Sequence, residues 1–103
     1  MKRVINGKVY NTNTAEELHS YWNHRGAGDF QYLSEDLYKT KKGNFFLAGE
    51  GGAMTKYSQS CGENSVCGGS GIHPLDPDEA LEWAENHGMS AYKIAEHFEV
   101  VEA

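Results

Sequence analysis

One stretch near the middle of the chain, residues 37 to 52, restricts the possible folds more than any other. It is typical of two strands joined by a tight turn, because β-branched and aromatic residues flank Gly43, which can adopt the positive φ of a short hairpin loop. Phe45, Phe46 and Leu47 are consecutive, so both faces of the second strand need apolar cover. The sequence therefore predicts that this strand lies in the interior of a sheet.

A second hairpin is predicted at the N-terminus, over residues 2 to 11. Asn6 and Gly7 stand between two short β-prone runs, and Asn-Gly is the dipeptide most typical of a type I′ turn. Residues 53 to 58 could add one more short strand. Residues 60 to 71 are rich in glycine, serine and asparagine, a composition typical of a mobile surface loop.

A first helix is predicted to start at Ala15. Thr14 and Glu17 have the spacing of a capping box, in which the threonine hydroxyl accepts from the Glu17 amide and the glutamate reaches back. The apolar residues that follow at the spacing i, i+3 and i+4 would form a stripe facing the sheet, and they are Leu18, Tyr21 and Trp22. The glycines between residues 26 and 28 should end this helix.

The clearest helix start lies in the second half of the chain. Asp76 is suited to the N-cap, Pro77 to the first helical position, and Glu79 to the third position of a capping box. This helix is expected to run to His87, with Gly88 closing it. The side chains expected to be buried are Ala80, Leu81 and Ala84, with Trp83 at the margin of their stripe.

A third helix is predicted from Ala91 to Phe98, with Ser90 as its cap. Together with the hairpins, these helices indicate an α+β fold: a small antiparallel sheet of three to five strands, with two hairpins, packed with about three helices. The chain has 103 residues, the length of one domain, so residues 1–103 are expected to form a single domain. Its 12% aromatic content indicates a folded globule, because disordered chains lack this much mass to bury.

The composition also indicates which classes of binding partner and which cellular location to expect. A net charge of −6 argues against sequence-independent binding of nucleic acid, which needs a basic surface, and favours a basic protein partner. No apolar run follows Met1-Lys2-Arg3 as in a signal peptide, and none approaches the length of about 18 residues that a membrane-spanning helix needs. We therefore expect a cytoplasmic protein without a membrane segment.

The negative charge is concentrated in one half of the chain. Residues 1 to 56 hold eight Lys or Arg and six Asp or Glu, for a charge of +2, whereas residues 57 to 103 hold one Lys and nine Asp or Glu, for −8. Asp78, Glu82 and Glu85 recur at i, i+4 and i+7 and should share one exposed helix face. Such a face either keeps the protein in solution or imitates phosphates and docks on a basic cleft.

The two cysteines suggest three possibilities. Cys61 and Cys67, with His73 and His24, could ligate a metal, but the C-x5-C spacing is not that of a preorganised zinc knuckle. A conditional disulfide closing the loop is a better interpretation, and two inert loop thiols are better still in a reducing compartment. We therefore expect no metal.

Other candidate sites also have simpler explanations. The run Gly49-Glu50-Gly51-Gly52 could cradle a phosphate, but Glu50 lies inside it and no helix start follows, which favours a glycine-rich turn or bulge at a strand end. None of the five histidines has a nucleophile or carboxylate at a meaningful spacing, and His87 and His97 lie at predicted helix C-termini, where the dipole favours imidazolium. We therefore expect neither catalytic residues nor a cofactor.

Three segments, which span most of the chain, carry a family resemblance. They are the run from Lys2 to Thr12 with Thr14-Ala15-Glu16, the run from Leu37 to Leu47 with Gly49 to Gly52, and Pro74-Leu75 with the run from Glu79 to Ala84. In these segments the chain resembles a family of small proteins carried by phages and other bacterial mobile elements, some of which act as anti-CRISPR inhibitors. The resemblance implies a role directed at the bacterial host.

Three functional hypotheses follow. The first is a non-enzymatic inhibitor that binds a basic, nucleic-acid-contacting surface of a bacterial CRISPR effector and does not itself bind nucleic acid. Its expected partner-binding residues are acidic, with two aromatic anchors that would serve if exposed: Asp76, Asp78, Glu79, Glu82, Glu85, Trp83 and Tyr57. The second is an enzyme or small-ligand protein that uses the turn from Gly49 to Gly52, Lys56 and a histidine. The third is an interaction module of a mobile element that could form a homodimer and has no CRISPR role.

Overall fold

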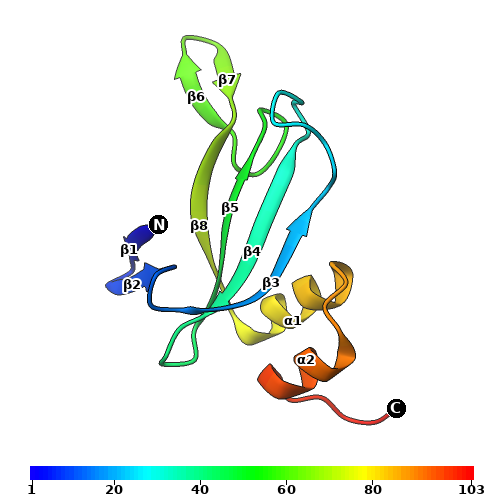
Figure 1. Cartoon of the computed structure of the whole chain (residues 1–103). Coiled ribbons are helices and arrows are strands. Elements are labelled where there is room, and N and C mark those ends of the chain that lie inside the picture. Colours follow the sequence, from blue (N-terminus) through cyan, green and yellow to red (C-terminus); the bar gives the residue numbers. More distant parts are fainter.

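The computed structural model describes residues 1 to 103 and has an α+β fold. The main sheet is antiparallel and contains, in spatial order, β3 (Glu16–Trp22), β4 (Leu33–Lys39), β5 (Phe45–Gly51) and β8 (Gly69–Leu75). Two separate hairpins are formed by β1 (Lys2–Ile5) with β2 (Lys8–Asn11), and by β6 (Gln59–Gly62) with β7 (Ser65–Cys67). The helices are α1 (Pro77–Asn86) and α2 (Ala91–His97). They lie at one end of the sheet, and the β6–β7 hairpin projects from the other end (Figure 1).

The prediction for the central hairpin is confirmed. Strands β4 and β5 pair antiparallel, with Leu37 opposite Leu47, and β5 lies between β4 and β8. Gly43 has φ +87 in the turn, as a short hairpin loop requires. Phe45 and Phe46 are 5% and 0% exposed, so consecutive apolar residues do occupy both faces of an interior strand.

The prediction of an N-terminal hairpin is also confirmed. This hairpin packs on the face of the main sheet that is turned away from the helices. Asn6 and Gly7 have φ values of 52° and 76°, the two positive angles of a type I′ turn. Tyr10 of β2 is buried edge-on against Phe46, with ring centroids 5.4 Å apart. Ile72 of β8 belongs to the same small apolar cluster. The hairpin therefore closes one half of this face.

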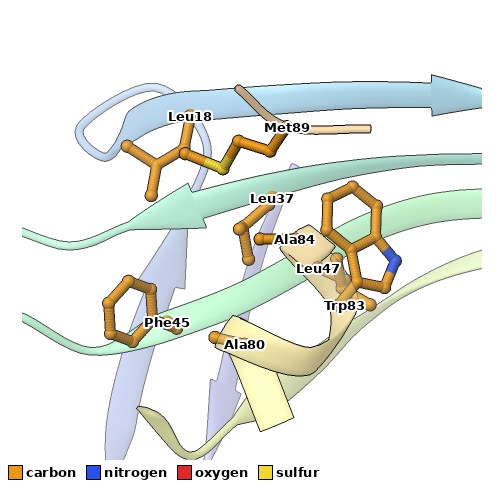
Figure 2. Close-up of a cluster of buried hydrophobic side chains, with 8 residues drawn as sticks. All are labelled: Leu18, Leu37, Phe45, Leu47, Ala80, Trp83, Ala84 and Met89. Carbon is orange, nitrogen blue, oxygen red and sulfur yellow. The ribbon is translucent and has the colours of Figure 1, made fainter. Parts of the chain in front are cut away.

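The larger core lies on the opposite face, between the sheet and the helices. Figure 2 shows its eight buried residues, which are Leu18, Leu37, Phe45, Leu47, Ala80, Trp83, Ala84 and Met89. Ala80 and Ala84 let the axis of α1 approach the sheet closely, and the Trp83 ring fills the space beside them. The sequence predicted that Leu81 would be buried and that Trp83 would lie at the margin of the stripe. Instead, Trp83 is central to the buried stripe and Leu81 is only half-buried.

The capping signals of α1 are confirmed at both ends. The Asp76 carboxylate accepts from the Glu79 amide at 2.8 Å, and the Glu79 carboxylate accepts from the Asp76 amide at 3.0 Å. His87 is the C-cap, and Gly88 has φ +80. The amide of Met89 then donates to the carbonyl of Ala84 at 3.2 Å, which is the long bond of a Schellman motif.

Helix α2 follows its prediction closely. The Ser90 hydroxyl accepts from the Lys93 amide at 3.2 Å, and the helix ends at His97, one residue before the predicted end. Phe98 follows as the C-cap and stacks on Phe45, with ring centroids 4.8 Å apart. This stacking ties the helical end of the chain back to the central strand. Neither helix has the length and apolar content needed to cross a membrane.

The predicted helix from Ala15 is wrong, because residues 16 to 22 form strand β3. This strand pairs with β4 through a register shift between Glu17 and His19, which makes Leu18 the extra residue of a β-bulge. The bulge lets Leu18 join the core on the helix side, while Tyr21 packs against the same core. Leu18 and Tyr21 both point inward and are three residues apart, which is also the spacing of side chains on one face of a helix. The periodicity and the capping-box pattern therefore both predicted a helix where the chain forms a strand.

Two predictions for the segment between β5 and β8 are also wrong. Residues 53 to 58 form turns rather than a strand, and the Met54 amide donates to the Phe30 carbonyl at 2.8 Å. Residues 60 to 71, predicted as a loop, contain most of the β6–β7 hairpin and the first residues of β8. Asn64 has φ 59 in the hairpin turn, so the asparagine and glycine content marks a turn rather than an irregular loop.

Candidate functional site

A buried carboxylate lies at the centre of the molecule. Glu35 is on the helix-facing side of β4 and is 1% exposed. Its carboxylate accepts from the Lys56 ammonium at 2.5 Å, the Tyr57 hydroxyl at 2.6 Å and the Trp83 indole N–H at 3.1 Å. We call these four residues the Glu35 cluster. It joins β4 to α1 and to residues 52–58, which we call the covering loop.

The Glu35 cluster holds its charges in fixed states. Burial alone would raise the pKa of Glu35, but the hydrogen bonds from Lys56, Tyr57 and Trp83 outweigh burial and leave this pKa below its usual value. Burial, and then the hydrogen bond to Glu35, raise the pKa of the Tyr57 hydroxyl. The cluster therefore contains a carboxylate at Glu35 and a neutral phenol at Tyr57 near neutral pH.

Strand β5 needs glycine at positions 49 and 51, because the covering loop lies directly on the strand and leaves no room for a side chain. A Cβ at Gly49 would collide with the Tyr57 hydroxyl and come within 2.8 Å of the Ser34 carbonyl oxygen. A Cβ at Gly51 would collide with the Thr55 hydroxyl. Both glycines are paired strand residues, so the interpretation of residues 49 to 52 as a turn or bulge is wrong. Close packing of protein on protein, rather than a bound phosphate, explains these glycines.

A lysine and a histidine do lie near these glycines, as the ligand-binding hypothesis required. His73 on β8 packs edge-on against Tyr57, with ring centroids 5.0 Å apart, and burial followed by the charge of Lys56 lowers its pKa. A cavity of about 200 Å³ beside them is lined by Arg3, Lys56 and His73 among others. However, both oxygens of Glu35 already accept hydrogen bonds from protein donors. The cluster therefore binds the covering loop to the sheet, with protein donors on both oxygens of its carboxylate.

Two other histidines surround the Trp83 ring. The His19 Nε2–H donates to the carbonyl of His87 at 2.8 Å, and the His87 Nδ1–H donates to the carbonyl of Trp83 at 2.7 Å. Because a carbonyl can only accept, these bonds fix which ring nitrogen carries the proton. The His87 ring stacks on Trp83, with centroids 4.5 Å apart. These histidines hold the C-terminal turn of α1 against β3.

The outer face of α1 carries the predicted acidic residues. We call this face the acidic surface, and its members are Asp76, Asp78, Glu79, Glu82 and Glu85, all exposed. Asp76 and Glu79 use their carboxylates in the capping box, which leaves the other three free of such bonds. No Lys or Arg forms a salt bridge with any of the five. The charge of the three free carboxylates is therefore open to solvent and to any basic partner.

Tyr57 and Trp83 do not belong to any exposed surface. They are 4% and 7% exposed, because the hydroxyl of one and the indole N–H of the other bind Glu35 inside the molecule. The condition on which either could anchor a partner is thus not met. Sequence reasoning missed Glu35 itself, although it occupies an inward position between Leu33 and Leu37 in the alternation of β4.

The opposite end of the sheet carries an open cleft. Its volume is about 560 Å³, and its lining includes Phe30, Glu50, Val66 and Cys67. Phe30 and Val66 are 67% and 57% exposed. Cys61 lies in the same hairpin as Cys67, and no three His, Cys, Asp or Glu side chains come together as a metal site. The cleft is therefore an apolar-rimmed surface distinct from the acidic one.

Comparison of the chain with protein-family models, with curated proteins and with solved structures finds no match. The functional argument therefore depends on the residues themselves. Inside the molecule, the Glu35 cluster fixes α1 and the covering loop to the sheet. Outside, the same helix presents carboxylates without basic partners.

Proposed function

We propose that this protein is a non-enzymatic inhibitor that binds, through its acidic surface, a basic and nucleic-acid-contacting surface of a bacterial CRISPR effector. The observation that carries the proposal is the acidic surface, where exposed carboxylates on one helix lack any Lys or Arg partner. Complementary charge of this kind steers a protein to its partner and sets its orientation there. The phage-family resemblance of the sequence suggests the class of partner.

The arrangement of these charges suits a groove that normally holds nucleic acid. RNA-guided nucleases hold the guide and target strands in a positively charged channel and recognise the backbone rather than the sequence. Asp78, Glu82 and Glu85 form a row along one side of a helix, with neighbours about 5 to 6 Å apart. Such a row offers closely spaced negative charge to cationic side chains that otherwise bind phosphates. Occupation of the channel would deny access to guide or target.

The helix that carries the row is firmly held. Trp83 projects from its inner side and donates to Glu35, and both ends of the helix are capped. Rigid presentation lowers the ordering cost of association, because the side chains of the partner meet a surface already in its bound form. The internal Glu35 cluster therefore supports the external surface without touching the partner.

A second candidate function uses the opposite end of the molecule. Phe30, Met54 and Val66 are each more than half exposed, and two of them line the cleft beside the β6–β7 hairpin. Exposed apolar side chains around a concavity are typical of a protein interaction site. This observation favours an interaction module of a mobile element that meets a less charged partner and has no CRISPR role.

The test is inhibition of purified effectors. A panel of guide-loaded CRISPR ribonucleoproteins of different types is incubated with the protein, and guide-directed DNA cleavage is measured at rising salt. The proposal expects loss of cleavage for at least one effector type, with inhibition weakening as salt screens the contact over about 8 to 10 Å. Uninhibited cleavage across the panel, or inhibition that does not depend on salt, would contradict it and favour the second candidate.

A further inference from the structure

The β6–β7 hairpin brings both cysteines of the chain together. Gln59 lies opposite Cys67 and Ser60 opposite Val66, but the register then shifts so that Cys61 has no residue opposite it. Cys61 is therefore the extra residue of a bulge and lies diagonally across the hairpin from Cys67, whose directly opposite residue is Gln59. The hairpin projects beyond the sheet, away from the helices (Figure 1).

The two thiols are neighbours in space and differ in access to solvent. Cys61 is exposed and Cys67 is half-buried. The Cys67 thiol donates to the Gln59 carbonyl at 3.6 Å, and its contact with the Cys61 thiol, more than burial, raises the pKa of Cys67. A disulfide needs Cα atoms within about 7 Å of each other. Cys61 lies diagonally across the hairpin from Cys67, a position about 7 to 8 Å away in a regular antiparallel pair, so closure needs a small movement of the bulged strand.

We propose that Cys61 and Cys67 form a reversible redox pair, which an oxidised low-molecular-weight disulfide such as glutathione disulfide converts into an intramolecular disulfide across the hairpin. The Cys61 thiolate attacks one glutathione sulfur, forming a mixed disulfide and expelling one glutathione thiolate. The Cys67 thiolate then attacks the Cys61 sulfur and expels the second. The protein sulfurs lose two electrons to glutathione disulfide, and their two protons go to the released glutathione thiols.

The order of attack follows from the positions of the two thiols. The exposed Cys61 meets a bulky disulfide first, whereas Cys67 is shielded and remains protonated to higher pH. Cys67 is therefore the resolving thiol. In a reducing cytoplasm the pair would stay reduced and would close only when the glutathione pool becomes oxidised, as is usual for redox-sensing cysteines.

Closure would fix one wall of the apolar-rimmed cleft. Val66 and Cys67 line that cleft, and Gln59 binds the hairpin base to the Gly68 carbonyl at 3.4 Å. A two-stranded hairpin is marginally stable by itself, so it opens more readily than the main sheet. Closing a ring from residue 61 to residue 67 disfavours the opened hairpin by roughly fifty-fold in the chain-entropy picture.

The experiment equilibrates the full chain in buffers of glutathione and glutathione disulfide and counts free thiols by alkylation and intact mass. The wild type should lose both alkylatable thiols as a monomer, and amide exchange in β6 and β7 should slow by roughly fifty-fold while β4 and β5 stay unchanged. Both thiols remaining free in glutathione disulfide, disulfide-linked dimers as the main product, or unchanged exchange in the hairpin would each overturn the proposal.

Single variants separate the two roles. Cys67→Ser keeps the exposed thiol and should accumulate one stable glutathione adduct at Cys61, because no resolving thiol is left. Cys61→Ser should form its adduct more slowly. Both substitutions lie in a surface hairpin, and circular dichroism checks that the fold survives. Equal rates of adduct formation in the two variants would overturn the assignment of Cys61 as the attacking thiol.

Discussion

The helix-facing side of the sheet is covered by α1 over one half and by the covering loop over the other, and the two halves are held together differently. Under α1, β5 contributes Phe45 and Leu47, which pack on small and aromatic side chains of the helix. Under the covering loop, the same strand contributes Gly49 and Gly51, and the buried contacts are hydrogen bonds to Glu35. One strand thus changes from bulky apolar residues to glycine within five positions.

The difference has consequences for how each half tolerates change. An apolar contact is non-directional, so swaps that conserve volume cost little there. A buried carboxylate is directional and depends on all its donors, so loss of one leaves an unpaired charge or acceptor inside. The stability of the half under the covering loop should therefore depend on pH and on the loss of single hydrogen-bonding atoms. The stability of the half under α1 should depend mainly on changes in side-chain volume.

The largest effect is expected at Trp83, where the two halves meet. Trp83→Ala should destabilise the protein by about 3 to 5 kcal/mol, because it empties the core beside Ala80 and removes a donor from Glu35. Trp83→Phe keeps most of the ring and loses only the N–H, so its smaller cost isolates the hydrogen bond. Urea unfolding measures both. Equal stability of Trp83→Phe and wild type would show that the indole hydrogen bond adds nothing.

The next largest change in stability is expected from alanine substitution in a matched pair of glycines. Gly49 and Gly71 lie directly opposite each other in β5 and β8, but a Cβ meets Tyr57 at the first position and open space at the second. Gly49→Ala should cost about 1 to 3 kcal/mol through overpacking. Gly71→Ala should be neutral or stabilise by up to about 1 kcal/mol, because alanine loses less entropy in a strand. Similar unfolding midpoints for both variants would refute the close packing of the covering loop.

The pH dependence of stability should come mainly from the loop half. The native pKa of Glu35 lies below the unfolded value of about 4.3, so its stabilisation is complete above that pH and is lost as pH falls through the lowered native pKa. His73 also has a lowered native pKa, so its contribution is lost as pH falls below about 6.5 towards that pKa. Urea midpoints from pH 3 to 8 should show both losses. Glu35→Gln should remove the more acidic loss and keep the His73 loss, which becomes larger because the carboxylate no longer raises the His73 pKa; an unchanged profile in that variant would contradict the assignment.

A smaller loss of stability is expected at the start of α1. Asp76→Ala removes one capping bond and should cost about 1 kcal/mol. Because Asp76 acts on the helix backbone, partner affinity should change little. Thermal unfolding and a binding assay together measure the two quantities. Unchanged unfolding with a collapse of binding would instead place Asp76 in direct contact with the partner.

Local chemistry explains which parts of this fold could be predicted. Asn6 and Gly7 determine a turn by their own backbone preferences, and Asp76 and Glu79 determine a helix start within four residues. Strand β3 could not be predicted because its bulge at Leu18 exists only relative to the partner strand β4. The helix pattern in its sequence is real, but tertiary pairing overrides it.

The candidate site also has one part that could be predicted from the sequence and one part that could not. The acidic surface could be predicted because one helix carries it and helical spacing places its members. The Glu35 cluster could not, because its donors lie 21, 22 and 48 residues away along the chain. The glycines at 49 and 51 resembled a phosphate loop for a related reason, since the side chains that lie on them come from a separate turn.

The central claim is that the acidic surface, and not the cleft at the opposite end, binds the partner. The most direct measurement compares association rates of two folded variants with an effector that the wild type inhibits. Asp78→Asn/Glu82→Gln/Glu85→Gln acts on the acidic surface, and Ser60→Lys/Glu63→Lys acts on the β6–β7 hairpin; each raises the net charge of −6 by three. We expect the first to associate about tenfold more slowly at low salt and the second to match the wild type. Slow association of only the hairpin variant, or equal slowing of both, would contradict the claim.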